Sequence, residues 1–233
     1  LVQSKDYGKV TADTGSIEAG AVRDTFAIKG ANEISTKAEN GAITIDVRHE
    51  KAVYIHAAGV VGQMISYSTD EANAPDVKVM TKCDNHGTIT TTAETTGLSS
   101  ARIGGVAGYI TRGITNFSDN HNHGAITCND HVAGRTIGGI VGSHSWSAIT
   151  NCTNNVEGVI KNSGELSGSN NLYAGGISAS DLAITNEDYA AYDLKAENCY
   201  VSNCHNKAEI IHDGTCKSIF LAGIVARTTS ATI

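Results

Sequence analysis

Two histidines and a glutamate recur at one position of the sequence and have the chemistry of metal ligands. His86 and His123 each stand directly before a Gly-x-Ile phrase, and Glu157 stands before the next such phrase. If these copies stack, neighbouring side chains lie within about 5 Å of one another, and such imidazole and carboxylate groups bind zinc. A hydrophilic turn would contain the same residues, and the sequence has no HExxH or paired CxxC spacing. The three residues are therefore metal candidates only, and we expect no cofactor.

A second group of residues has the chemistry of a sugar-binding site. Tyr109 follows the phrase IGGVAG, and His144 and Trp146 follow the equivalent phrase IGGIVG. Consecutive copies would place Tyr109 and Trp146 on the same side, where their rings could stack on a glycan. The alternative is that Trp146, the sole tryptophan, packs against its neighbouring loop.

Catalytic groups are not expected. Polysaccharide-cleaving enzymes need convergent acid and base groups, such as a carboxylate pair. The repeated positions hold Gly, Ile, Asn and Thr, whereas Asp and Glu are concentrated between the repeats. No nucleophile elbow or Ser/His/Asp order stands out. The sequence therefore favours a protein that is not an enzyme.

A three-part phrase positions all of these side chains. Its clearest copy runs from Gly124-Ala125-Ile126 through IGGIVG at 137–142 to AITNC at 148–152. The first part recurs at Gly41, Gly87 and Gly158, and the second recurs around Gly59, Gly105, Gly176 and Gly223. The third part recurs as MTKC at 80–83, ITNF at 114–117 and VSNC at 201–204. Such repetition is typical of stacked units that bury a core only against their neighbours.

The copies align into three aliphatic columns, which predict three short strands in each repeat. The first column holds Val10, Ile43, Ile89, Ile126, Ile160 and Ile210. The second holds Val60, Val106, Ile140, Ile177 and Ile224, and the third holds Ile34, Met80, Ile114, Ile149 and Val201. We predict an all-β, right-handed parallel β-helix (a β-solenoid) of about five to six irregular rungs.

We expect one domain over 1–233, with clear repeats at 34–226 and a degenerate N-terminal rung at 8–33. Insertions of irregular length are predicted at about 63–77 and 178–199, and the second of these could form a short helix. In the second strand, Ile140 is expected in the core, with Ile137 and Val141 on the opposite face. That apolar stripe predicts either a partner surface or a cover formed by the insertions.

The cysteines and asparagines also fall into columns. Cys83, Cys152 and Cys204 share a position with Phe117, which predicts buried, unpaired thiols. Cys128, Cys199 and Cys216 are irregular, and a bridge between two of them stays open. Asn116, Asn151 and Asn203 precede this position, and Asn85, Asp119, Asn154 and Asn206 follow it by two residues. Asn and Asp tolerate bends and hydrogen-bond along a stack, so these columns predict turn ladders.

Composition limits the partners. The 233 residues have a net charge of −7 and show no Lys/Arg cluster, which argues against nucleic acid. No apolar stretch approaches the roughly 20 residues that cross a bilayer. The chain begins at Leu1, so we interpret it as a piece of a longer polypeptide. We also expect the solenoid to continue beyond the phrase SIFLAGIVA at 218–226, because no cap follows it.

The phrases IGGVAG at 103–108, IGGIVG at 137–142 and AITNCTNNVEGVI at 148–160 resemble the GLUG-type repeats of bacterial surface proteins. The resemblance covers roughly 34–226 and implies a secreted or cell-surface β-solenoid in a bacterium. It carries no catalytic residue. It implies a non-catalytic adhesive or structural spacer module whose partners are surface glycans or proteins of the host or of bacteria. A carbohydrate-binding module using Tyr109 and Trp146 is the alternative, and a polysaccharide-cleaving enzyme is the third interpretation.

Overall fold

The computed structural model describes residues 54–65, 78–92, 100–111, 115–145, 147–166, 171–181 and 200–228, together with backbone strands between residues 2 and 47. Every regular element in this described part is a β-strand. It contains no α-helix of the length and hydrophobicity that a bilayer crossing requires. Trp146, Cys199 and the possible helix in the second insertion lie outside the described residues.

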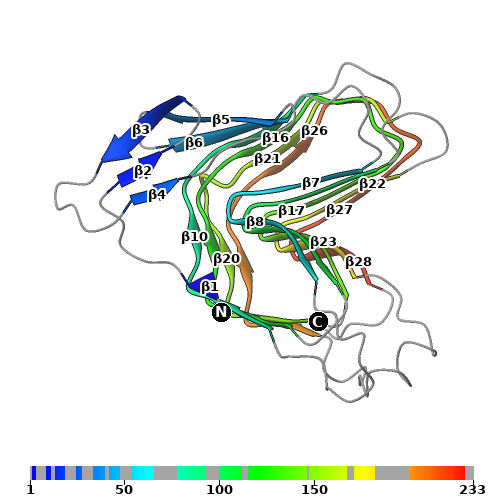
Figure 1. Cartoon of the computed structure of the whole chain (residues 1–233). Helices are drawn as coiled ribbons and strands as arrows, with labels where there is room; N and C mark the ends of the chain where they lie inside the picture. The colour runs from blue at the N-terminus through cyan, green and yellow to red at the C-terminus, as the bar shows by residue number, and fades with distance from the viewer. Residues whose placement is uncertain are drawn as a thin grey trace, which may run out of the picture.

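Five strands make one turn of a parallel coil (Figure 1). A representative turn contains β14 (Thr115–Ser118), β15 (His121–Asn122), β16 (Ile126–Cys128), β17 (Arg135–Gly138) and β18 (Val141–His144). Each of these strands pairs in parallel with its equivalents in the turns on either side. The predicted parallel β-helix is therefore confirmed.

The equivalent strands form five sheets, which we name after the strands of that representative turn. The β14 sheet adds β1 (Val2–Gln3), β9 (Lys78–Thr81), β19 (Ser147–Thr150) and β24 (Tyr200–Ser202). The β15 sheet adds β10 (Asp84–Asn85), β20 (Thr153–Asn154) and β25 (His205–Asn206). The β16 sheet adds β11 (Ile89–Thr91), β21 (Ile160–Asn162) and β26 (Ile210–His212), and it continues into the N-terminal strands.

The remaining two sheets are built from the two halves of the second phrase. The β17 sheet adds β7 (Tyr54–Ala58), β12 (Ser100–Gly104), β22 (Asn171–Gly175) and β27 (Ser218–Ala222). The β18 sheet adds β8 (Val61–Ile65), β13 (Ala107–Thr111), β23 (Ser178–Asp181) and β28 (Val225–Arg227). These two sheets meet at a sharp bend, so that the chain folds back on itself in every turn (Figure 1).

The prediction of three strands in each turn is too low, because two of the three phrases bend in the middle. The first phrase forms one strand, such as β16. The second phrase breaks at Gly139 and Ile140, with β17 before the bend and β18 after it. The third phrase breaks at a residue in the left-handed conformation, which is Asn151 between β19 and β20, with φ of 55°.

The predicted register of the third phrase is wrong in one copy. Phe117 pairs with Met80 and Ile149, and therefore belongs to their aliphatic column in place of Ile114. Asn120 consequently occupies the cysteine position, where its Oδ1 accepts the backbone N–H of Cys83 over 2.9 Å. The left-handed bend column is Lys82, Asp119, Asn151 and Asn203, which excludes Asn116. The ladder column is Asn85, Asn122, Asn154 and Asn206, which excludes Asp119.

The N-terminal strands depart from the regular coil. They comprise β2 (Lys9–Thr11), β3 (Thr14–Glu18), β4 (Thr25–Ala27), β5 (Ile34–Glu39) and β6 (Ala42–Val47). β2 pairs antiparallel with β3, and β5 pairs antiparallel with β6. This stretch therefore differs from the predicted degenerate rung. β6 joins the coil with Ile45, two residues beyond the predicted Ile43, beside Ile89.

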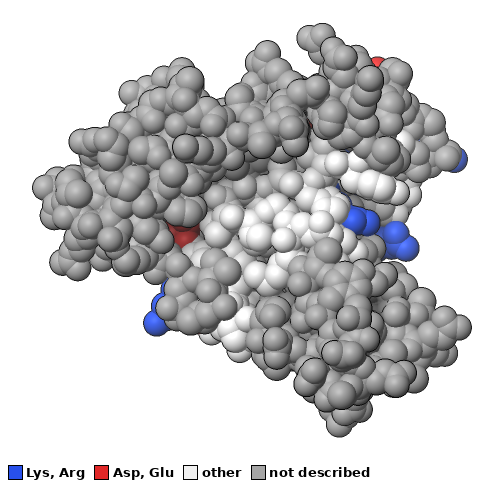
Figure 2. All heavy atoms as spheres, viewed as in Figure 1, with Lys and Arg blue, Asp and Glu red and all other residues white. Residues whose placement is uncertain are grey.

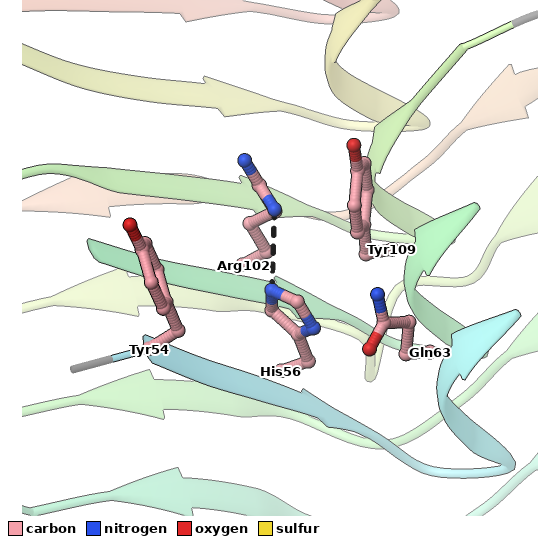
Figure 3. A pocket seen from close by; sticks show the side chains of 5 residues that line it. All are labelled: Tyr54, His56, Gln63, Arg102 and Tyr109. Atoms are coloured by element: carbon pink, nitrogen blue, oxygen red, sulfur yellow. Dashed lines mark hydrogen bonds between the residues drawn. The ribbon is translucent and has the colours of Figure 1, made fainter. Parts of the chain in front are cut away.

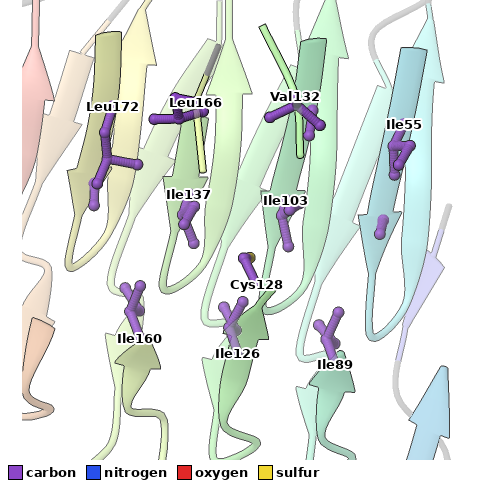
Figure 4. Packing of buried hydrophobic residues seen from close by; sticks show 13 residues of the cluster. Ile55, Ile89, Ile103, Ile126, Cys128, Val132, Ile137, Ile160, Leu166 and Leu172 are labelled. Atoms are coloured by element: carbon purple, nitrogen blue, oxygen red, sulfur yellow. The ribbon is translucent and has the colours of Figure 1, made fainter. Parts of the chain in front are cut away.

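Over the residues that the structure describes, the core consists of two clusters. One lies between the β16 and β17 sheets and includes Ile126, Ile137 and Leu172 (Figure 4). The other lies between the β14 and β18 sheets and includes Phe117, Ile140 and Val141. Ile140 is buried, as predicted, but Ile137 and Val141 are buried as well. The expected outward stripe at these two residues is wrong, because the bend at Gly139 interrupts the alternation of a single strand.

The side-chain amides of one asparagine column connect successive turns. Asn85 donates to Asn122 over 2.8 Å, Asn122 donates to Asn154 over 2.9 Å, and Asn154 donates to Asn206 over 2.9 Å. This ladder packs against the glycine column at the bend of the second phrase. A Cβ built on Gly139 would lie 2.5 Å from Cγ of Asn154 and 2.1 Å from the carbonyl oxygen of Gly176. Glycine is needed there because no space remains for a side chain.

Candidate ligand-binding groove

The bend of the second phrase brings the outer faces of the β17 and β18 sheets toward each other. Along β12, Ala101 and Ile103 point into the core, so Arg102 between them points to the outer face. Glycines in β13 and β18 allow the two sheets to approach closely next to the bend. A Cβ on Gly142 would lie 2.6 Å from the backbone nitrogen of Ile103. Away from the bend the sheets diverge and leave space between them.

An open cavity of about 590 Å³ fills this space at the N-terminal end of the described coil. Tyr54, His56 and Arg102 line it from the β17 sheet, and Gln63 and Tyr109 line it from the β18 sheet (Figure 3). All five side chains point to the same side of the ribbon. The cavity therefore collects two aromatic rings, an imidazole, an amide and a guanidinium from four strands.

Arg102 lies at the centre of these contacts. Its guanidinium carbon lies 4.0 Å from the centre of the Tyr109 ring, which is a cation–π contact. Its Nη1 lies 3.2 Å from Nε2 of His56. The His56 ring is in turn 5.2 Å from the Tyr109 ring, tilted by 59°. These contacts hold Arg102 in place, since a flexible side chain is restrained on two sides.

The charge of this cavity comes from Arg102 and not from His56. Burial, with a smaller contribution from the Arg102 charge, lowers the pKa of His56 from its ordinary value of 6.5, against a raising effect of the Gln63 hydrogen bond. At neutral pH the imidazole is therefore uncharged. Because a guanidinium only donates, Nε2 of His56 accepts the hydrogen bond from Arg102.

A second cavity, of about 290 Å³, continues along the coil and also has Arg102 in its lining. Beyond Arg102 its outer-face lining includes Thr136 and Tyr173 of the β17 sheet and Ser143, Ser180 and Arg227 of the β18 sheet. We call the two cavities together the axial groove. In Figure 2, blue Lys and Arg atoms lie on the right of the described surface, where the β17 and β18 sheets diverge in Figure 1.

The structure separates the residues that the sequence grouped as a sugar site. Tyr109 lines the groove, as a platform would. His144 does not, because it is fully buried in the interior, where its Nδ1 lies 2.8 Å from the Ser178 hydroxyl. Ser143 is the residue next to Tyr109 in the following turn, so the register does not pair Tyr109 with Trp146. Trp146 itself lies outside the described residues.

The metal candidates come together without forming a site. The rings of His86 and His123 stack in parallel, with centres 4.4 Å apart and planes 7° apart. Oε2 of Glu157 lies 3.8 Å from Nδ1 of His123. Asn155 occupies the next position of this column, and its Nδ2 lies 3.2 Å from Nε2 of His123. In stacked rings the nitrogen lone pairs point in parallel directions, so they do not converge on one metal position. Over the described residues, no group of three ligating side chains is positioned to hold a metal ion.

Cys128, Cys152, Cys204 and Cys216 form no disulfide bond, as predicted for Cys152 and Cys204, but the prediction that Cys204 is buried is wrong. Cys83, Cys128 and Cys152 are buried, whereas Cys204 and Cys216 are half-buried. Because Cys128 and Cys216 are both free, no pair among Cys128, Cys199 and Cys216 is bridged. Burial raises the pKa of Cys128 to about 12. The hydrogen bond between the neighbouring thiols Cys152 and Cys204 raises the pKa of the more buried Cys152 and lowers that of Cys204.

Sequence reasoning missed Tyr54, His56 and Arg102, although a signal for them exists. Ile55 and Ala57 alternate with Tyr54 and His56, which indicates that the latter two point outward. The alignment of Ala58 with Gly104 places His56 opposite Arg102, as the register shows. Combining the column alignment with strand alternation predicts that His56 and Arg102 are neighbours on the outer face of one sheet, but not that Gln63 and Tyr109 of the β18 sheet face them.

Comparison of the chain with protein-family models, with curated protein sequences and with solved structures returns no match in any of the three.

Proposed function

We propose that this protein is a non-catalytic adhesive β-solenoid that binds glycans in the axial groove. The observation that carries this proposal is the cavity in which Tyr54, His56, Gln63, Arg102 and Tyr109 converge on open space. Its volume of about 590 Å³ lies within the range of about 300–1,000 Å³ that is usual for ligand sites.

The residue types suit a sugar ligand. Tyrosine rings offer flat apolar faces to the C–H face of a pyranose, while their hydroxyl groups remain available for hydrogen bonds. Gln63 and Arg102 add hydrogen-bond donors beside Tyr109. These groups stand on paired strands, so the site is rigid before the ligand arrives, and little conformational entropy is lost on binding.

The proposal extends to location and partners. The resemblance of the second and third phrases to GLUG-type repeats supports a secreted or cell-surface protein of a bacterium. Host or bacterial surface glycans are the partners that the groove chemistry favours. Hydrolysis of such a glycan usually uses a carboxylate pair. The described residues that line the groove include no Asp or Glu, which supports binding without catalysis.

A glycan array probed with the intact protein, followed by calorimetry on the hits, tests this proposal. Tyr109→Ala should weaken binding about tenfold, which corresponds to about 1.4 kcal/mol. Tyr200→Ala is the matched control, because Tyr200 lies on β24 and does not line either cavity. Equal losses in the two variants would place the glycan elsewhere. Release of reducing sugar from a bound polysaccharide would overturn the non-catalytic assignment.

A structural spacer is the second candidate. It is favoured by the asparagine ladder, which joins four successive turns by side-chain hydrogen bonds and stiffens the coil along its axis. A silent glycan array with a correctly folded protein would favour this function over adhesion.

A further inference from the structure

The axial groove contains two arginine–tyrosine pairs, one toward each end. Toward the N-terminal end, the Arg102 guanidinium lies 4.0 Å from the centre of the Tyr109 ring. Toward the C-terminal end, the Arg227 guanidinium lies 5.4 Å from the centre of the Tyr173 ring. Tyr173 also stacks on Phe220, with ring centres 4.9 Å apart and planes 14° apart. The second pair is thus backed by a two-ring aromatic surface.

The two pairs come from opposite walls of the groove. Arg102 stands on the β17 sheet and Tyr109 on the β18 sheet, whereas Tyr173 stands on the β17 sheet and Arg227 on the β18 sheet. The turn of Arg227 is three turns beyond that of Arg102. At about 4.8 Å for each turn, the backbone positions of the two arginines are about 14 Å apart along the axis.

The stretch between the two pairs is lined by smaller polar residues. Thr136 stands between Arg102 and Tyr173 on the β17 sheet. On the β18 sheet, the Ser143 and Ser180 hydroxyls lie 3.1 Å apart. Ser143, Ser180 and Thr136 Oγ1 are buried, so these small side chains form the floor of the second cavity, which both Arg102 and Arg227 line.

The charge of the groove is opposite to that of the chain. The net charge of the protein is −7, yet the described lining of the groove contains two exposed or half-exposed arginines and no carboxylate. No described Asp or Glu forms an ion pair with Arg102 or Arg227. Both guanidiniums are therefore available to anionic groups of a ligand, which they bind with strong charge-assisted hydrogen bonds.

We infer that the axial groove takes an extended acidic polysaccharide that lies along the solenoid axis, with one carboxylate or sulfate at Arg102 and another at Arg227. This inference rests on the proposed glycan-binding function and specifies its ligand class. The sugar chain passes over the small side chains in the middle of the groove, and the aromatic rings contact sugar faces.

The spacing of the cations distinguishes this ligand from nucleic acid. A nucleic-acid strand has about one phosphate every 3.4 Å and would bring about four charges into 14 Å. The described lining of the groove offers two accessible cations over that length, Arg102 and Arg227, which matches a polymer whose charges are separated by neutral groups.

Calorimetry with acidic oligosaccharides of increasing length tests the inference. The probes are uronate-containing and sulfated oligomers, together with methyl-esterified or desulfated forms of the same backbones. Affinity should rise until the oligomer spans about 14 Å. Arg102→Gln and Arg227→Gln should each weaken binding of the long acidic oligomers about tenfold or more. The affinity of oligomers too short to span about 14 Å should depend on only one of the two arginines.

Two controls make the outcome specific. Lys207→Gln removes one positive charge from a residue that does not line the groove, and it should leave affinity unchanged. Arg102→Lys keeps the charge and should retain part of the binding, provided that the melting temperature of each variant equals that of the wild type.

The possible failures are distinguishable. If the neutral forms bind as tightly as the acidic ones, the glycan site stands and the acidic ligand class is overturned. If Lys207→Gln weakens binding as much as Arg102→Gln, the attraction is a general charge effect and the two-arginine site is overturned. If no glycan binds, the proposed function itself fails. Tighter binding of a single-stranded oligonucleotide than of every glycan would also overturn the inference.

Discussion

The side-chain amide of Asn122 donates a hydrogen bond to Oδ1 of Asn154 in the next turn over 2.9 Å. The same amide nitrogen donates to the backbone oxygen of Gly124, and Oδ1 of Asn122 accepts from the backbone N–H of Gly124. The buried side chain of Asn122 thus closes the tight bend before Gly124, and it also links one turn of the coil to the next.

Replacing Asn122 by Ala should therefore destabilise the protein. The change leaves buried partners on Gly124, Asn85 and Asn154 without their hydrogen bonds, at about 1–3 kcal/mol for each unsatisfied group. Chemical denaturation measures the loss in free energy of unfolding. Asn116→Ala is the matched control, because Asn116 is exposed and outside the ladder. Equal effects of the two changes would show that the ladder contributes nothing.

A methyl group should be tolerated at one glycine of the bend column and not at another. A Cβ on Gly139 would lie 2.1 Å from the carbonyl oxygen of Gly176, whereas a Cβ on Gly223 would meet nothing within 4 Å. Gly139→Ala should lower the free energy of unfolding by about 1–3 kcal/mol or more, since the backbone has to shift. Gly223→Ala should change it by less than about 0.5 kcal/mol. Thermal and urea unfolding of the two variants decide the matter.

The buried ion pair between Arg135 and Asp130 should show strong coupling. Both side chains are fully buried, with Nη2 of Arg135 2.5 Å from Oδ1 of Asp130. Asp130→Asn or Arg135→Met alone leaves a buried charge without its partner and should cost about 3–5 kcal/mol, whereas the double replacement should cost less than the sum. The exposed pair of Lys161 and Asp213 is the control and should contribute at most about 1 kcal/mol. Additive effects in the Arg135–Asp130 cycle would refute the coupling.

Thiol labelling should follow burial and the pKa directions. Cys204 is half-buried with a lowered pKa and should react first in the native protein. Cys128, which is buried with a pKa of about 12, should react only after unfolding, since the thiolate is the reactive form. Peptide mapping after timed alkylation measures the order, with Cys204→Ser as the control for the fast site. Fast native labelling of Cys128 would contradict the packing around it.

His56 should make stability decrease with falling pH. Its pKa in the folded protein is lowered from 6.5, so the unfolded chain binds more protons in the window between the two values. Stability present above pH 6.5 is therefore lost progressively as the pH falls from about 6.5 through the folded pKa. The groups that face His56 are Arg102, Tyr109 and Gln63, and none is an acid that would reverse this sign. Denaturation at several pH values should show a shallower slope in His56→Gln, and identical slopes would refute the assignment.

The sequence by itself determined the coil and much of its core. The column Ile89, Ile126, Ile160 and Ile210 and the column Val106, Ile140 and Ile177 appear in the structure as aligned from the sequence. Parallel stacking repeats the same environment in every turn, so residues at one position are selected for the same burial. Alignment of the repeat copies therefore shows which positions of each turn are buried.

Only the tertiary structure decided the register at Phe117 and the existence of the groove. The letters ITN at 114–116 match ITN at 149–151, which would pair Ile114 with Ile149. The left-handed bend at Asp119 and the ladder contact of Asn122 go instead with pairing of Ile149 with Phe117, three residues after Ile114. The groove is built from outward positions such as His56, Arg102 and Tyr109, which differ from turn to turn. Such positions are not constrained by the common core, so no repeated pattern marks them. Their contacts arise because the bend at Gly105 and Val106 folds one sheet back toward the other.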